Sequence, residues 1–178
     1  MTNLTIINTN ARSLCPKLRS LIDCIGEMEA SLAIVTETWM KKGQAMTELE
    51  DELLLGNGLG IMARNREALS NGVAYGGVAL VWKEALGSFR EVELPNPQGY
   101  EVLVAAGTVR GYSRKMIVVA CYLPPNMTRV KGAAALDFIE ETVIAMKRRF
   151  KDPYLVIAGD FNQWDVGGTL ENLSLIHI

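Results

Sequence analysis

Five oxygen-bearing side chains stand just beyond apolar runs of this sequence, where packing alone does not require them. They are Asn10, Glu37, Tyr122, Asp160 and Asn162. Carboxylate and amide oxygens are hard ligands that suit Mg²⁺ or Mn²⁺. Neutral amide and phenol groups can also hold a phosphate oxygen without opposing the charge of a cation. If these side chains converge, they predict metal-assisted chemistry on a phosphate group.

Each of these residues also has an ordinary explanation when it is considered alone. An aspartate after a strand is most often a turn residue or a helix cap, and a lone glutamate is most often solvated. Asn10 is compatible with a local turn, and Tyr122 is compatible with half-buried packing. A functional interpretation therefore depends on strands that end at the same place.

The elements that must position these side chains are mostly strands. Apolar runs and turn signals predict strands over residues 4–8, 32–36, 58–64, 76–83, 89–94, 100–109, 115–123 and 154–158. Helical spacing predicts helices over residues 16–28 and 133–150, the second ending in a basic turn that suits its dipole. Strands outnumber helices, and the helices lie far apart in the sequence. This pattern favours sheets packed together with helices outside them.

Composition limits the class of protein. The chain has 178 residues, of which 49% are hydrophobic and 21% charged, so we expect one domain with a buried core. A net charge of −2 gives no global sign of a nucleic-acid partner, which must be argued from local sites. Cys15, Cys24 and Cys121 have neither metal-like nor disulfide-like spacing. With no secretory signal and no apolar run of membrane length, we expect a nuclear or cytoplasmic protein without a membrane partner.

Several stretches resemble a known family in their order and approximate spacing. They are IINTNARSL, IVTETW, GGVALVWK, ACYLPPN and VIAGDFNQW. Together they resemble the endonuclease/exonuclease/phosphatase superfamily, and most closely the N-terminal endonuclease domain of non-LTR (LINE-type) retrotransposons. The resemblance implies a four-layer α/β/β/α sandwich. It also implies hydrolysis of a DNA phosphodiester with Mg²⁺ or Mn²⁺, leaving a 3′-hydroxyl that primes reverse transcription.

The resemblance also implies a role for each candidate residue. Glu37 and Asn10 correspond to the metal-side pair, with Glu37 the principal ligand. Tyr122 corresponds to the residue that contacts the scissile phosphate. Asp160 corresponds to the acid that orients or deprotonates the attacking water, and Asn162 to a phosphate donor in the transition state. This division suits phosphoryl transfer, which needs charge neutralisation and an aligned nucleophile.

Other functions of the same residues stay open at this point. The superfamily resemblance also fits an abasic-site repair endonuclease, or a phosphatase acting on inositol lipids or sphingomyelin. A non-catalytic degenerate copy that serves as an interaction module is a further alternative. Trp39 and Trp164 flank the predicted site and suit either base stacking or packing. Several basic residues suit either contact with a DNA backbone or a solvated surface. They are Arg110, Arg114, Lys115 and the basic residues within 147–151.

The C-terminal end departs from the family's pattern, which continues with further strands and a Ser-Asp-His-type segment. His177 follows the GDFN stretch too closely to be that histidine. The codons CTG TCT CTT ATA CAC ATC encode LSLIHI and match the end of a common sequencing adapter. We therefore expect residues 1–172 to be a partial domain and residues 173–178 a non-native tail. The missing remainder would include a reverse transcriptase, and the fragment alone would be inactive or nearly so and prone to aggregation at an unpaired sheet edge.

Overall fold

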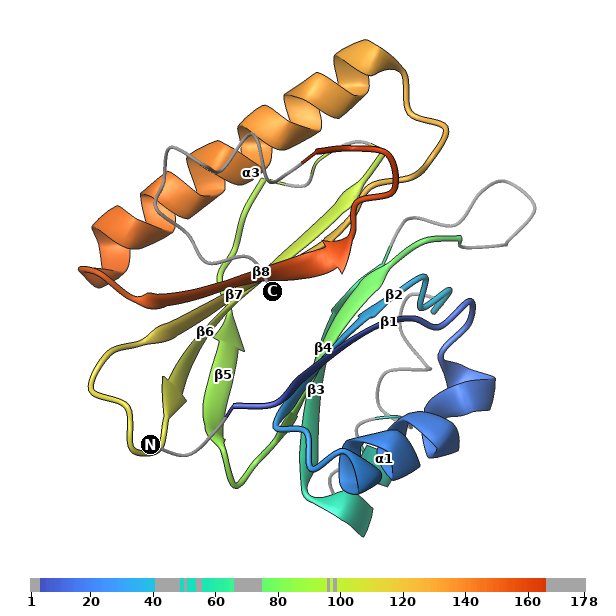
Figure 1. Ribbon diagram of the computed structural model, residues 1–178, viewed down its shortest axis with the longest axis vertical. Helices are drawn as coiled ribbons and strands as arrows, with labels where there is room; N and C mark the ends of the chain where they lie inside the picture. The colour runs from blue at the N-terminus through green and yellow to red at the C-terminus, as the bar shows by residue number, and fades with distance from the viewer. Residues whose placement is uncertain are drawn as a thin grey trace.

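Two four-stranded sheets form the centre of the protein in the computed structural model shown in Figure 1. The first sheet has the order β1 (Ile6–Asn10), β2 (Leu32–Thr36), β4 (Val78–Lys83) and β3 (Leu59–Arg64). The second has the order β5 (Gly87–Glu91), β6 (Glu101–Val109), β7 (Met116–Tyr122) and β8 (Tyr154–Asp160). The structure describes residues 4–40, 49, 51–53, 56–65, 75–95, 97 and 99–165.

The helices α1 and α3 lie on the outer faces of the two sheets. A 3₁₀ turn (Cys15–Lys17) leads into α1 (Leu18–Glu27), which lies against the first sheet, and α3 (Arg129–Phe150) lies across the second (Figure 1). The order of layers is therefore helix, sheet, sheet, helix, which confirms the predicted four-layer sandwich. Among the helices that the structure describes, none has the length and apolar character needed to cross a membrane.

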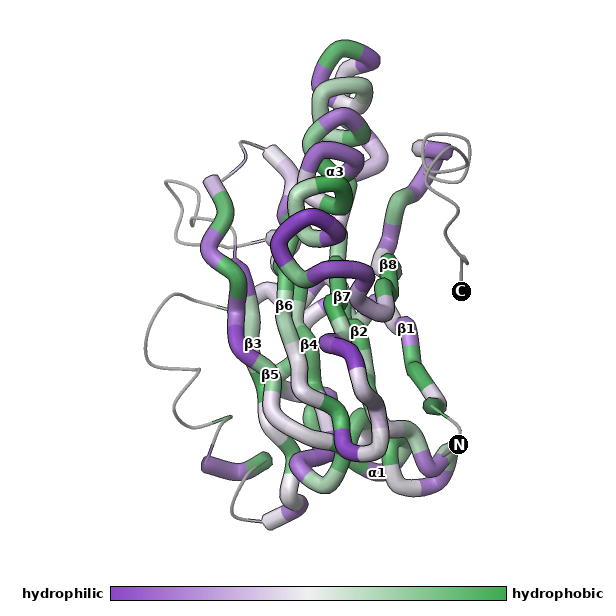
Figure 2. Tube along the Cα trace, turned by 90° about the vertical axis from the view of Figure 1, so that its left-hand side faces the viewer, coloured by the Kyte–Doolittle hydropathy of each residue, from purple (hydrophilic) through white to green (hydrophobic). Residues whose placement is uncertain are grey.

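Alternating side chains of the inner strands build three apolar layers. In β2, Ala33 and Val35 pack towards α1, while Leu32 and Ile34 point into the space between the sheets. The strand β7 is buried at all seven positions and contributes to the layer between the sheets and to the layer under α3. A strand covered on both faces needs apolar residues throughout. The inner strands accordingly appear as apolar stretches in Figure 2.

The predicted elements are present, but several of their ends differ. The strand β1 runs over Ile6–Asn10 instead of residues 4–8, because it pairs residue by residue with β2 up to Asn10 and Thr36. The helix α3 begins four residues earlier than predicted, because the side chain of Thr128 accepts a hydrogen bond from the Lys131 backbone and caps it. The strand β5 also begins and ends earlier than predicted, at Gly87 and Glu91.

One further difference concerns the predicted site. The strand β8 continues through Asp160, which lies in register with Tyr122 of β7, so the prediction of a strand ending at residue 158 was wrong. The Asn71-Gly72 pair, whose residue types predict a turn, lies outside the described residues, as do His177 and the tail at residues 173–178.

Candidate active site

Two parallel strand pairs bring the candidate residues to one edge of the sandwich. In the first sheet, β1 runs parallel to β2, so Asn10 lies beside Thr36 and Glu37 follows immediately. In the second sheet, β7 runs parallel to β8, so Tyr122 lies beside Asp160. The side-chain amide of Asn8 donates a hydrogen bond of 2.9 Å to the carbonyl of Gly159 and joins the sheets at this edge. The predicted convergence is therefore present, although the strands belong to two different sheets.

Asn10 connects the two carboxylates of this edge. Its side-chain nitrogen donates to Glu37 Oε1 and to Asp160 Oδ2, both at 2.9 Å. The phenol of Tyr122, whose side chain is almost fully buried, donates to the same oxygen of Glu37 at 3.2 Å. Four of the five predicted residues therefore form one hydrogen-bonded chain that crosses from the first sheet to the second.

The fifth residue, Asn162, is tied to the same chain. Its backbone N–H donates to Asp160 Oδ1 at 3.1 Å, and its side-chain amide donates to the carbonyl of Leu123 at 2.8 Å. Asp160 therefore receives a hydrogen bond on each carboxylate oxygen, one from β1 and one from the turn that follows β8. These bonds hold the carboxylate in a fixed orientation, as a group that aligns a nucleophile requires.

Backbone strain coincides with two of the site residues. Glu37 and Asn162 adopt left-handed conformations with φ of 52° and 50°. Such conformations are uncommon outside glycine and persist where surrounding structure enforces them, often at functional sites. For Glu37 that enforcement is visible, because its carbonyl accepts from the Ser13 N–H at 2.8 Å. The hydroxyl of the buried neighbour Thr38 donates to Asn65 at 3.3 Å.

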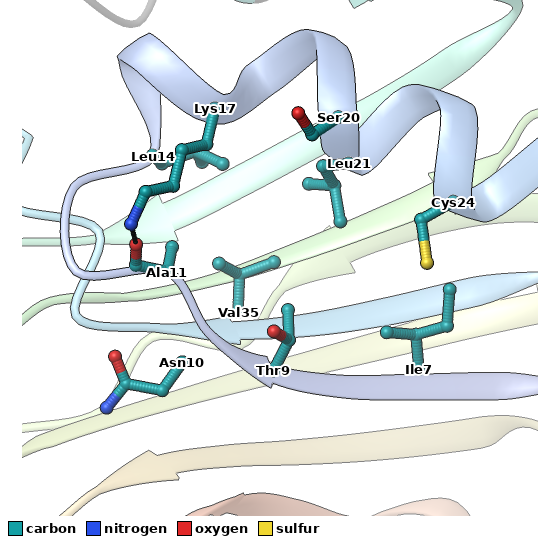
Figure 3. Close-up of a pocket in the computed structure, with 10 residues that line it drawn as sticks. All are labelled: Ile7, Thr9, Asn10, Ala11, Leu14, Lys17, Ser20, Leu21, Cys24 and Val35. Atoms are coloured by element: carbon teal, nitrogen blue, oxygen red, sulfur yellow. Dashed lines mark hydrogen bonds between the residues drawn. The ribbon is translucent and has the colours of Figure 1, made fainter.

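A hollow of about 400 Å³ lies beside these residues, between the tips of β1 and β8. Its lining is balanced between polar and apolar groups and consists of Asn8, Thr9, Asn10, Thr36, Gly159, Asp160, Phe161 and Asn162. A second hollow of about 260 Å³, between β1 and α1, has mostly apolar walls (Figure 3). No carboxylate lines it, whereas the first hollow has the side chain of Asp160. The first hollow is therefore the better match to a phosphate and a cation.

The donor set fits a hard divalent cation. Glu37 and Asp160 offer carboxylate oxygens, and no sulfur or imidazole joins them in the part of the chain that the structure describes. Within the same residues, no cluster of three or more acidic, histidine or cysteine side chains occurs. Asn10 turns its amide nitrogen to both carboxylates, and its oxygen accepts from the Arg12 N–H at 3.2 Å. Mg²⁺ suits such a site, because it keeps several waters and commonly binds through one or two carboxylates and substrate phosphates.

Three residues near the site were not predicted. Asn8 has a signal in the sequence, because it lies two positions before Asn10 and a strand repeats its faces every two residues. Asn65 has no such signal, because only the pairing of β3 with β4 brings it near Thr38. Lys17 reaches from the 3₁₀ turn to the carbonyl of Ala11 and holds the segment that follows Asn10 (Figure 3).

Other residues considered from the sequence lie away from the carboxylates. The indole of Trp164 packs against Gly132 of α3, in the apolar layer beneath that helix. Arg114 pairs with Asp152 and covers the ring of Tyr154, with 4.2 Å from guanidinium carbon to ring centre. Tyr154 begins β8, so this cluster lies at the opposite end of the strand from Asp160.

Comparison with known proteins agrees with this architecture. The model of the Endonuclease/Exonuclease/phosphatase family matches residues 4–175. The chain belongs to this family. The family match covers all five site residues and both sheets. No protein of curated function matches the chain in sequence.

Solved structures of the same fold include three that illustrate its range. An AP endonuclease from Archaeoglobus fulgidus is 15% identical with a TM-score of 0.59, over 89% of this chain and 57% of that one. The human Nocturnin catalytic domain is 13% identical with a TM-score of 0.68, over 97% of this chain and 69% of that one. The endonuclease domain of TRAS1, a telomere-specific non-LTR retrotransposon, is 15% identical with a TM-score of 0.58, over 96% of this chain and 71% of that one. The chain thus spans little more than half of the first of these proteins.

Proposed function

We propose that this chain is the DNA-nicking endonuclease domain of a non-LTR retrotransposon and hydrolyses a phosphodiester with the help of a divalent cation. The observation that carries the proposal is the hydrogen-bonded chain in which Asn10 joins Glu37 to Asp160. It links Asp160, which lines the polar hollow, to Glu37, which follows β2 of the other sheet. Family membership supports phosphodiester chemistry at this place.

Each site residue has a proposed role that follows from its position. Glu37, with Asn10, would hold Mg²⁺ or Mn²⁺, which supplies charge neutralisation at the non-bridging phosphate oxygens. Asp160, oriented through both of its oxygens, would accept the proton of the attacking water. The phenol of Tyr122 and the amide of Asn162 would donate hydrogen bonds to the phosphate. Both groups hydrogen-bond within the protein in this structure, to Glu37 and to Leu123.

The retrotransposon assignment depends on the stretches NARSL and YLPPN. The first continues from Asn10 and the second from Tyr122, so both belong to the loops that surround the site. In a retrotransposon, the 3′-hydroxyl left by the nick would prime a reverse transcriptase on the same polyprotein. We propose a nuclear or cytoplasmic setting and DNA as the partner.

A substrate comparison tests this function against repair and lipid hydrolysis. Purified protein is incubated with Mg²⁺ and supercoiled undamaged plasmid, a duplex containing one abasic site, or sphingomyelin and inositol phosphate substrates. One cut converts a supercoiled plasmid to an open circle, so even very slow turnover is visible. We expect open circles to form only slowly in Mg²⁺, in keeping with the nearly inactive fragment that the sequence predicts, with none in EDTA and no lipid hydrolysis. Cleavage confined to the abasic duplex, or to the lipids, would contradict the proposal.

A further inference from the structure

An aromatic pair stands beside Glu37 and has no part in the chemistry described above. The rings of Trp39 and Tyr75 meet edge to face, with 5.2 Å between ring centres and 88° between planes. Trp39 is half-buried, whereas Tyr75 leaves 49% of its surface exposed. Edge-to-face contact stabilises such a pair and restrains both rings. A restrained, open aromatic ring therefore packs on Trp39, which is two residues from the proposed metal ligand Glu37.

Strand register places this pair on the rim of the site. The strand β4 is antiparallel to β2, and Val78 lies opposite Thr36, so the residues before Val78 lie beside those after Thr36. The Trp39 N–H accordingly donates to the Gly76 carbonyl at 3.0 Å. Tyr75 therefore lies beside Trp39, three residues beyond the tip of β2. The hollow lies on the other side of β2, at β1 and β8, so a bound nucleic acid would have to cross the tip of β2 to meet this ring.

The backbone of Trp39 has an uncommon conformation. Its φ is 49°, a left-handed value that is exceptional for a bulky side chain. Glu37, two residues earlier, has the same kind of conformation. Strained residues persist where the surrounding structure enforces them, and they cluster at active sites and ligand-binding regions. The segment that carries Glu37 and Trp39 therefore has the backbone character of a functional region.

We propose that Tyr75, supported by Trp39, stacks on an unpaired nucleobase beside the scissile phosphate. The inference rests on the proposed function and adds the class of substrate: a nucleic acid with at least one base unstacked at the cut. Aromatic side chains bind bases of any sequence in this way, because every base has a π-face. A lipid or inositol phosphate has no base to stack on this ring.

Binding to two probes tests the inference without requiring turnover. Fluorescence anisotropy in EDTA measures binding of a labelled single strand of about 12 nucleotides, a length within the usual site sizes. A second probe has the same backbone, with tetrahydrofuran in place of every base. We expect Tyr75→Ala to bind the first probe about tenfold more weakly and the second unchanged. Tyr75→Phe keeps the ring and should bind both probes as wild type does.

A tyrosine at the far end of the sheets provides a matched control. Tyr112 also forms an edge-to-face pair, with Tyr154, at 5.3 Å and 89°. Tyr112→Ala should leave both affinities unchanged, and thermal unfolding of each variant reports on folding. Equal losses for the two probes, no loss in Tyr75→Ala, or a Tyr75→Phe variant as weak as Tyr75→Ala would each overturn the inference.

The proposed function can fail separately from this inference. Wild-type protein that nicks plasmid but binds both probes equally would overturn base stacking alone. Wild-type protein that neither nicks plasmid nor binds either probe would overturn the proposed function, and the stacking inference with it.

Discussion

At the scale of single residues, the site depends on the hydrogen bonds that the carboxylate oxygens of Asp160 and Glu37 accept. Asp160 accepts from Asn10 on one oxygen and from the Asn162 backbone on the other. Glu37 accepts from Asn10 and Tyr122 on a single oxygen. The residue types and their order were readable in the sequence. The bridging position of Asn10 was not, because it depends on β1 and β8 facing each other from different sheets.

The first prediction concerns Asp160. Asp160→Asn keeps the size but removes the base and can accept only one of the two hydrogen bonds that Asp160 receives, so we expect plasmid nicking to fall about 100-fold or more, with a modest fall in the thermal unfolding midpoint. Asp152→Asn is the matched control, because Asp152 is an exposed carboxylate at the other end of β8. Equal nicking by Asp160→Asn and wild type would show that Asp160 is not the base.

The second prediction concerns the cysteines. Complete burial raises the pKa of the Cys121 thiol far above its usual range, because the thiolate would have to form in an apolar layer. Cys15 is exposed. Since the thiolate is the reactive form, a thiol reagent at pH 8 should modify Cys15 rapidly and Cys121 only after denaturation. Mass spectrometry of the modified peptides measures this, and rapid labelling of Cys121 in the folded protein would contradict its position in β7.

At the scale of elements, strand ends decide where the chemistry is placed. The sequence predicted a strand that ends at Ala158, with Gly159 allowing a tight exit from it. The structure keeps Gly159 inside β8 with φ of 145°, where an added Cβ would collide with the carbonyl oxygen of Cys121. The glycine is required by close approach of β7, and such an approach cannot be read from one strand's sequence. The start of α3 was missed for a different reason. The prediction followed the apolar periodicity, whereas the helix begins where Thr128 caps it.

The third prediction follows from this close approach. Gly159→Ala combines an unfavourable φ with overlap against β7, so we expect a loss of about 3 kcal/mol or more in the free energy of unfolding. Gly111→Ala is the control, because Gly111 also has a positive φ, of 80°, but an added Cβ there meets nothing within 4 Å. It should cost about 1 kcal/mol. Urea unfolding compares the two, and equal costs would contradict the packing described for Gly159.

At the scale of the whole molecule, three apolar layers hold two sheets and two helices in a fixed relation. The sequence predicted the fold class and the inner strands well, because β2 and β7 are apolar throughout. It could not predict which strands share a sheet. That assignment depends on crossover connections, such as α3, which carries the chain from β7 to the parallel strand β8.

The fourth prediction tests the layer beneath α3. Ile139 is completely buried there. Ile139→Ala leaves a cavity and should lower the free energy of unfolding by about 2–5 kcal/mol. Val130→Ala lies on the same helix at a position that is 80% exposed, and should change it by less than about 0.5 kcal/mol. A similar small effect for both variants would mean that α3 does not pack on the second sheet as described.

The measurement that tests the central claim most directly is Mn²⁺ binding, followed by the loss of the free-ion electron paramagnetic resonance signal on titration with protein. Binding is independent of turnover, so it reports on the site even where nicking is slow. The account predicts one bound Mn²⁺ per chain, displaced by Mg²⁺, lost in Glu37→Gln and retained in Asp152→Asn. Equal binding by Glu37→Gln and wild type, or no binding by wild type, would contradict the assignment of Glu37 and Asn10 as the metal site.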